Sequence, residues 1–154
     1  MIVTLQQFNS IRTKLKNKGL NIVFTNGCFD ILHKGHIYYL NEAKKLADFL
    51  VVGLNSDDSV KRLKGQNRPI NNENDRAYML DNLKPVDAVI IFKEDTPYNL
   101  ISEIKPDFLV KGGDWKENNI VGSDVVKSYG GKVKSIKYIE NYSTTSLLKE
   151  IKSK

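Results

Sequence analysis

Two histidines, His33 and His36, stand three residues apart in the stretch TNGCFDILHKGH, shortly after Gly27. Each imidazole offers a hydrogen-bond donor, and a glycine lets backbone amides approach a ligand closely. Gly35 lies where a helical pattern begins, and the first turn of a helix presents free N–H groups and the positive end of its dipole. This concentration of donors suits a polyphosphate ligand.

A single glycine or histidine would carry little weight, because a lone histidine more often has a structural role. Here both histidines belong to a His-x-Gly-His motif, and a Gly-x-Phe-Asp motif, from Gly27 to Asp30, comes just before it. The joint occurrence of the two motifs therefore favours a phosphate site over a structural role.

The residues around these motifs predict how the motifs are positioned. Ile22, Val23 and Phe24 indicate a short buried strand before them, and apolar residues at helical spacing from Ile37 to Ala47 indicate a helix after them. The motifs thus span a strand-to-helix crossing. Open α/β sheets bind their ligands beside such crossings, at the carboxyl ends of the strands, so we expect the phosphate site at that edge.

Further apolar runs predict four more strands, at residues 49–54, 86–92, 108–110 and 132–138. Capping residues and helical spacing predict helices near residues 4–19, 72–84, 96–104, 123–130 and 143–151. This alternation predicts a single Rossmann-like α/β domain over residues 1–154, with a doubly wound, parallel, five-stranded sheet. Residues 59–72 lack periodicity, so we expect a short helix and then a mobile loop there.

The composition is that of one globular domain: 154 residues, of which 40% are hydrophobic and 27% are charged. No apolar run approaches the length of about 20 residues that a membrane span needs, and no secretory signal is visible at the N-terminus. Because Cys28 is the only cysteine, the chain has neither an internal disulfide nor a multi-cysteine metal site. We expect a cytoplasmic protein.

The net charge of +6 is spread over most of the predicted helices. No dense basic run with interleaved aromatic residues occurs, so we expect no nucleic acid and no membrane among the partners. The sequence also lacks Gly-x-Gly-x-x-Gly, a P-loop, His-Glu-x-x-His and paired Cys-x-x-Cys motifs. Their absence weighs against a dehydrogenase, a P-loop kinase and a zinc hydrolase.

The two motifs resemble the signature of the HxGH nucleotidyltransferase superfamily, whose members join a nucleoside triphosphate to a phosphate-bearing acceptor and release pyrophosphate. Nearly the whole chain resembles one family within it, the D-glycero-β-D-manno-heptose 1-phosphate adenylyltransferases. The other segments that carry this resemblance are NSD (55–57), RLKG (62–65), RP (68–69), EDTP (94–97), VKGGD (110–114) and STT (143–145). In many bacteria this domain is fused behind a sugar kinase domain, and the chain is similar to the adenylyltransferase half alone.

The resemblance implies that His33, His36 and Lys64 are catalytic residues at the phosphates. It also implies ligand contacts, through side chains or backbone amides, at Asn26, Gly27, Cys28, Phe29, Asp30, Gly35, Asn55, Arg76, Gly112, Asp114, Ser143, Thr144 and Thr145. The partners it implies are small molecules, ATP and a sugar 1-phosphate, together with a second copy of the chain in a homodimer. Mg²⁺ is expected on ATP rather than in a protein metal site.

Several roles have two interpretations. Direct in-line transfer needs no covalent enzyme intermediate, so we expect Cys28 to be a packing residue and not a nucleophile. Asp30 could fix the turn or assist Mg²⁺, and Arg76 could bind phosphate or form an ion pair on a helix surface. Trp115 could be a pocket wall or part of the core. The hydroxyls of residues 143–145 could cap the last helix, contact the nucleotide, or do both.

The nearest alternative is a cytidylyltransferase for a polyol phosphate such as glycerol 3-phosphate, which would share the same motifs. Members of that group have Arg-Thr-Glu-Gly-Ile-Ser-Thr-Thr before the last helix, whereas residues 138–145 of this chain read YIENYSTT and lack the arginine. A more remote alternative is a non-catalytic module that binds a nucleotide or nucleic acid. The presence of both histidines and Lys64 together weighs against it.

Overall fold

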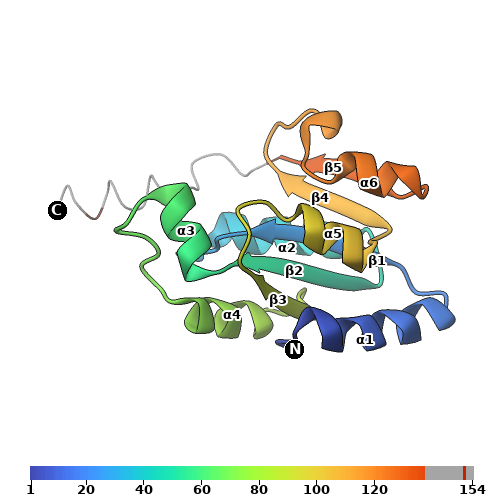
Figure 1. Cartoon of the computed structure of the whole chain (residues 1–154), viewed down its shortest axis with the longest axis horizontal. Coiled ribbons are helices and arrows are strands. Elements are labelled where there is room, and N and C mark those ends of the chain that lie inside the picture. The colour runs from blue at the N-terminus through green and yellow to red at the C-terminus, as the bar shows by residue number, and fades with distance from the viewer. Residues whose placement is uncertain (138–150, 152–154) are drawn as a thin grey trace.

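A computed structural model describes residues 1–137 and residue 151, and five parallel strands form one sheet in the order β3-β2-β1-β4-β5 (Figure 1). The strands are β1 (Ile22–Gly27), β2 (Phe49–Asn55), β3 (Ala88–Phe92), β4 (Phe108–Gly112) and β5 (Lys132–Ile136). The helices are α1 (Leu5–Asn17), α2 (Lys34–Lys44), α3 (Asp57–Lys64), α4 (Glu73–Asp81), α5 (Tyr98–Ile104) and α6 (Ser123–Ser128), with a 3-10 turn η1 (Glu117–Asn119). The predicted Rossmann-like, doubly wound sheet is confirmed.

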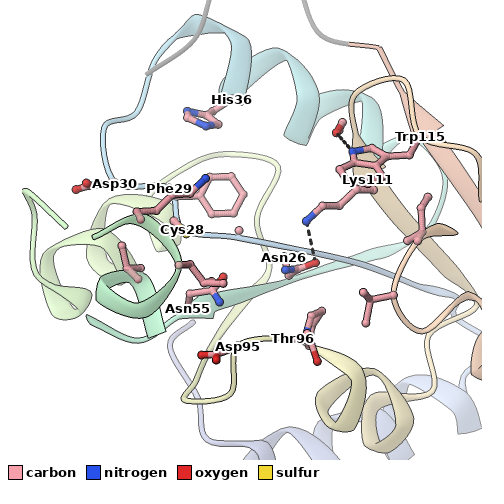
Figure 2. Close-up of a pocket in the computed structure, with 18 of the residues that line it drawn as sticks. Asn26, Cys28, Phe29, Asp30, His36, Asn55, Asp95, Thr96, Lys111 and Trp115 are labelled. Atoms are coloured by element: carbon pink, nitrogen blue, oxygen red, sulfur yellow. Dashed lines mark hydrogen bonds between the residues drawn. The ribbon is translucent and has the colours of Figure 1, made fainter. Parts of the chain in front are cut away.

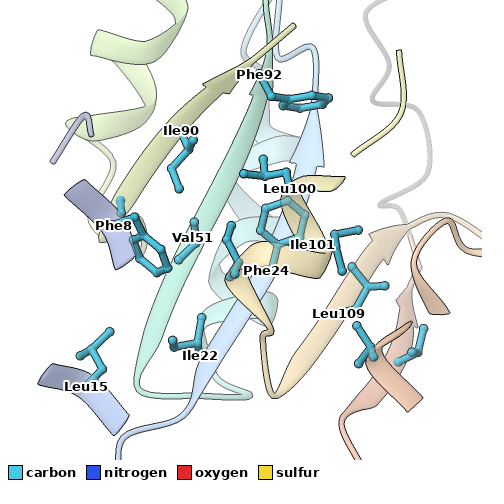
Figure 3. Packing of buried hydrophobic residues seen from close by; sticks show 14 of the residues in the cluster. Phe8, Leu15, Ile22, Phe24, Val51, Ile90, Phe92, Leu100, Ile101 and Leu109 are labelled. Atoms are coloured by element: carbon cyan, nitrogen blue, oxygen red, sulfur yellow. The ribbon is translucent and has the colours of Figure 1, made fainter. Parts of the chain in front are cut away.

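The sheet is buried on both faces because alternate residues of each strand point to opposite sides. Ile22 and Phe24 of β1 pack on one face with apolar residues of α1, α5 and α6 (Figure 3). Val23, between them, packs on the other face with residues of α2 and α4. Both faces of a strand must therefore be apolar, which explains continuous apolar runs in the sequence.

The position of β1 in the sheet creates an opening at its carboxyl end. It pairs with β2 along its whole length, from Ile22 opposite Phe49 to Gly27 opposite Leu54. With β4 it pairs only at two positions, the last of which is Phe24 opposite Leu109. Beyond Phe24 the pairing with β4 ends, and a switch point of this kind is where doubly wound sheets bind ligands.

Some element boundaries differ from those expected. β3 begins at Ala88 rather than at residue 86, and Pro97 rather than Thr96 is the N-cap of α5. The turn η1 was not expected, because three residues give no periodic signal. β5 ends at Ile136 rather than at residue 138. The predicted helix at 143–151 falls largely outside the described residues, so the single domain over 1–154 stays a prediction. Within the described part of the chain, no helix is long and apolar enough to cross a membrane.

A close contact between α5 and the sheet leads to a stability prediction at Gly53. A Cβ atom at Gly53 would lie 2.7 Å from Cζ of Phe24 and 3.2 Å from Cδ2 of Leu100. Gly53→Ala should therefore lower the free energy of unfolding by about 1–3 kcal/mol through overpacking, measured by urea denaturation. In a Phe24→Leu background the same change should cost clearly less, because the clashing ring is gone. Equal costs in both backgrounds would contradict this assignment.

Candidate active site

A cavity of about 610 Å³ lies at the carboxyl edge of the sheet, where β1 and β4 separate (Figure 2). Its walls come from the carboxyl ends of β1, β2 and β4 and the segments after β1 and β4, from α2 and α3, and from Arg68 and residues 95–97 and 119–121. Small-molecule sites typically enclose roughly 300–1,000 Å³. The cavity therefore has the position and the size of a ligand site.

Most of the predicted site residues line this cavity, namely Asn26, Gly27, Cys28, Phe29, Asp30, His36, Asn55, Lys64 and Gly112. Four others, His33, Gly35, Arg76 and Asp114, are not among its lining residues. Ser143, Thr144 and Thr145 lie outside the described residues. The ligand contacts expected for all of these residues stay predictions.

The two histidines form one stacked pair, with ring centroids 3.8 Å apart and an interplanar angle of 26°. Burial lowers the pKa of both rings, and the neighbouring His33 helps to bring the pKa of His36 to about 4. Both rings are therefore neutral at pH 7. Each has a buried Nδ1 atom without a hydrogen-bond partner in the described part of the protein, so it can bond to a ligand oxygen when it carries the proton.

The turn between β1 and α2 is held by the ring of Phe29. Phe29 has a left-handed backbone, with φ of 45°, which is a strained conformation for a residue other than glycine. Its ring packs 5.3 Å from His36 and folds back over Gly27, where a Cβ atom would lie 3.0 Å from the ring. Gly27 is thus needed for this close approach. The ring of Phe29 links the turn to the first turn of α2, which carries His36.

Asp30 has a structural role, which is one of its two interpretations, and assistance to Mg²⁺ stays a prediction. Its carboxylate accepts hydrogen bonds from the backbone amides of Ile70 (2.8 Å) and Asn71 (2.9 Å) and pairs with Arg68 at 2.6 Å. Burial disfavours the charged form, but the amides of Asn71 and Ile70 and the Arg68 guanidinium outweigh it and lower the pKa of Asp30. The carboxylate fixes the turn by fastening the loop after α3 to it.

The structure corrects the surface interpretation of Arg76, because its side chain is 0% exposed. Arg76 is also not among the lining residues of the cavity. The guanidinium donates to the carbonyl oxygens of Cys28 (2.6 Å), Asn55 (2.9 Å) and Asn71 (2.9 Å). It also pairs with Asp57 at 2.7 Å. Arg76 is therefore a buried positioning residue and not a surface ion pair, and the phosphate contact expected for it stays a prediction.

The short helix and loop expected between residues 59 and 72 are confirmed as α3 and the segment that follows it. Ser56 caps α3 by accepting a hydrogen bond from the amide of Ser59. Lys64 is the last residue of α3, is exposed, and lines the cavity. The mobility of the loop stays a prediction. Asp30 holds the second half of this loop in place.

Lys111 and Trp115 are among the lining residues that were not predicted as site residues. Lys111 is partly buried, and its Nζ lies 3.4 Å from Oδ1 of Asn26 (Figure 2). The signal for it was a lysine placed directly after the apolar run 108–110. Trp115 is 51% exposed and donates from Nε1 to the carbonyl oxygen of Gly112, so it is a pocket wall and not part of the core.

Cys28 is poorly suited to nucleophilic chemistry. Burial raises the pKa of its thiol, and the nearby Lys64, Arg76 and Lys111 only partly offset that effect. The thiol is therefore protonated at pH 7, and the thiolate is the reactive form. This protonation agrees with the expectation of a packing residue.

Asp30→Asn should lower the free energy of unfolding by about 2–3 kcal/mol near pH 7, because the amides of Ile70 and Asn71 and the guanidinium of Arg68 lose a charged acceptor. Since the folded pKa of Asp30 is lowered, its contribution is present above the ordinary aspartate pKa of about 3.9 and is lost as the pH falls through the folded value. The difference between wild type and variant should therefore shrink below about pH 4.

Hydrogen exchange supplies the local measurement for the same variant. The amides of Ile70 and Asn71 should exchange faster in Asp30→Asn, since both donate to the carboxylate that is removed. Asp58→Asn is a matched control, because the side chain of Asp58 is 81% exposed and its contact with Lys61 is long, at 3.7 Å. Unchanged exchange at both amides would show that Asp30 does not hold this loop.

The chain is similar in sequence to known proteins over nearly its whole length. It is 53% identical over 152 residues to "Bifunctional protein HldE" of a Nitratiruptor species, covering 99% of this chain and 32% of that protein. It is 56% identical over 149 residues to the protein of the same name from Campylobacter concisus, covering 96% and 31%. The chain thus spans about a third of the length of these relatives.

Solved structures agree with this similarity. A lipopolysaccharide core biosynthesis protein from Thermoplasma volcanium GSS1 is 36% identical, with a TM-score of 0.65 over 81% of this chain and 100% of that one. A pantoate-beta-alanine ligase from Francisella tularensis has a TM-score of 0.64 over 99% of this chain and 77% of that one, but at 20% identity it shows a shared fold only. The family model described as cytidylyltransferase-like matches residues 24–150, so the chain belongs to the cytidylyltransferase-like family of nucleotidyltransferases.

Proposed function

We propose that the chain transfers AMP from ATP to D-glycero-β-D-manno-heptose 1-phosphate, giving ADP-heptose and pyrophosphate. The observation that carries the proposal is the donor-rich cavity at the β1–β4 switch point, where Gly27, His36 and Lys64 meet. The choice of acceptor is supported by the heptose-type segments from Asn55 to Asp114 and by the similarity to HldE proteins. That similarity does not favour the polyol phosphate cytidylyltransferase alternative.

In the proposed reaction an oxygen of the sugar phosphate attacks the α-phosphorus of ATP. A new P–O bond forms there, the bond between the α-phosphorus and its bridging oxygen breaks, and the electron pair leaves with pyrophosphate. The attacking oxygen is already anionic, so no general base is needed. The protein contributes by holding two polyanions in line and by stabilising the charge that builds on the transferred group.

His36 is suited to act as a neutral hydrogen-bond donor. Its low pKa, about 4, leaves it uncharged at pH 7 when the site is empty, and its Nδ1 has no partner in the described part of the protein. A buried donor of this kind is already oriented before the reaction, so it costs little reorganisation as charge develops. His33 orients the ring of His36 by stacking on it, and Lys64 adds positive charge at the cavity rim.

We propose that Mg²⁺ enters with ATP and neutralises part of the triphosphate charge. Two carboxylates near the site, Asp30 and Asp57, are already engaged by Arg68 and Arg76, which supports a metal carried by the substrate. We further propose a cytoplasmic homodimer that takes small-molecule partners only, as the family resemblance implies. Sedimentation velocity of the purified chain tests the oligomeric state.

The proposed function is tested with a substrate matrix. ATP, CTP, GTP and UTP are each incubated with D-glycero-β-D-manno-heptose 1-phosphate, glucose 1-phosphate and glycerol 3-phosphate, and pyrophosphate release is measured. ATP with the heptose phosphate should give the highest kcat/KM. A higher value for CTP with glycerol 3-phosphate would overturn the proposal in favour of the cytidylyltransferase.

His36→Ala should lower kcat by roughly a hundred- to a thousandfold, or about 3–4 kcal/mol, because one preorganised donor is lost at the transition state. The free energy of unfolding should change little, since the side chain faces the cavity. Tyr38→Ala is a matched control on the same helix, with an exposed side chain, and should keep wild-type turnover. Near-normal turnover, or severe loss of stability, in His36→Ala would make His36 a structural residue.

A further inference from the structure

We propose that Lys111 is a catalytic residue that binds a reacting phosphate group in the crevice between β1 and β4. The proposal rests on the proposed nucleotidyl transfer and adds to it a residue from a different wall of the cavity than His36 or Lys64. Four observations on the described residues carry it: the strand register, the burial of the side chain, the absence of a nearby negative charge, and the second lysine across the cavity.

The strand register places Lys111 in the crevice. The last pairing between β1 and β4 is Phe24 opposite Leu109, and both side chains belong to the same apolar cluster. Because side chains alternate, Asn26 and Lys111, two residues further along each strand, lie on that same side beyond the point where pairing ends. Their side chains meet across the gap, with Nζ of Lys111 3.4 Å from Oδ1 of Asn26.

In the described part of the chain, the ammonium group of Lys111 lacks a counterion. Within residues 1–137, no carboxylate lies within 4.0 Å of its Nζ, and the contact with Asn26 is long for a hydrogen bond. The titratable groups there that act on its charge are Lys64, which is also positive, and the Cys28 thiol, which burial keeps protonated. Burial, with Lys64 adding to it, lowers the pKa of Lys111.

A partly buried cation without an opposite charge is costly in a folded protein, and a methionine or leucine would fill the same space at lower cost. An anion bound in the crevice removes that cost. A lysine ammonium is a compact point charge with three N–H donors, of which Asn26 takes one, so two are left for phosphate oxygens. The Lys111 environment thus matches a phosphate ligand.

Lys111 and Lys64 reach the cavity from opposite sides of β1. Lys64 ends α3, which follows β2, whereas Lys111 lies on β4, and β2 and β4 flank β1 in the sheet. Both line the cavity together with His36. The proposed reaction brings the triphosphate and the sugar phosphate into contact despite their mutual repulsion, and two cations on opposite walls offset that repulsion.

The test compares Lys111→Met with wild type in the substrate matrix and in thermal unfolding without ligand. Turnover with the preferred pair should fall at least about a hundredfold. The unfolding temperature of the free protein should stay equal or rise, because an uncompensated charge is replaced by an apolar side chain of similar length. Lys134→Met on β5, whose side chain is exposed, is the matched control and should match wild type in both measurements.

Calorimetric titrations with ATP and, separately, with the sugar 1-phosphate identify which phosphate Lys111 holds. Weaker binding of one ligand assigns Lys111 to that ligand. Loss of kcat with both affinities and the unfolding temperature kept assigns Lys111 to the transition state. Lys111→Arg should recover part of the lost activity because it keeps the charge. Should Lys111→Met not fold, Lys111→Gln replaces it in the same measurements.

Two results would overturn the inference. One is a Lys111→Met enzyme within about threefold of wild-type kcat/KM, and the other is a destabilised variant whose affinities for both ligands are unchanged, which would make Lys111 structural. Failure of the proposed function is a separate outcome. The wild-type protein then turns over no nucleotide–acceptor pair in the substrate matrix. In that case binding of inorganic pyrophosphate to wild type and Lys111→Met still decides whether Lys111 holds a phosphate group.

Discussion

A single buried arginine ties together the segments at the carboxyl edge of the sheet. The guanidinium of Arg76 bonds to the carbonyl oxygens of Cys28, after β1, and Asn55, at the end of β2, and it pairs with Asp57 at the start of α3. A charge fully removed from water is tolerated only while such partners are present. Arg76 therefore enforces one arrangement of the segment after β1, the end of β2 and the start of α3, and the turn after β1, β2 and α3 all contribute residues to the walls of the cavity.

The charges around the cavity divide into two groups with different tasks. Arg76 with Asp57, and Arg68 with Asp30, are satisfied inside the protein and hold backbone segments in place. Lys64 and Lys111 form no ion pair with a carboxylate in the described residues, and both line the cavity. The paired charges thus hold the backbone segments around the cavity in place. The unpaired charges are available to an anionic ligand, and leaving them unpaired lowers the stability of the protein.

Much of the fold and part of the site could be predicted because the signals are local. The apolar runs of β1 and β2 and the helical spacing after His36 depend only on neighbouring residues, and they predicted the elements to within a few positions. The family followed from the resemblance of the two motifs and the later segments to those of known nucleotidyltransferases, and the family match confirms it. The left-handed backbone of Phe29 had no such signal, because a phenylalanine seldom adopts it.

The sequence by itself determined the α/β class and the strand-to-helix crossing, since both follow from spacing along the chain. It also determined the family, through the resemblance of its motifs to those of known proteins. Only the tertiary structure decided which groups Arg76, Asp30 and Lys111 contact. Their partners Cys28, Arg68 and Asn26 are 48, 38 and 85 residues away, and a charged side chain can act as a clamp or as a ligand depending on what packing places beside it. Because burial and counterions set the energy of a charge, its role emerges only after the strands are in register.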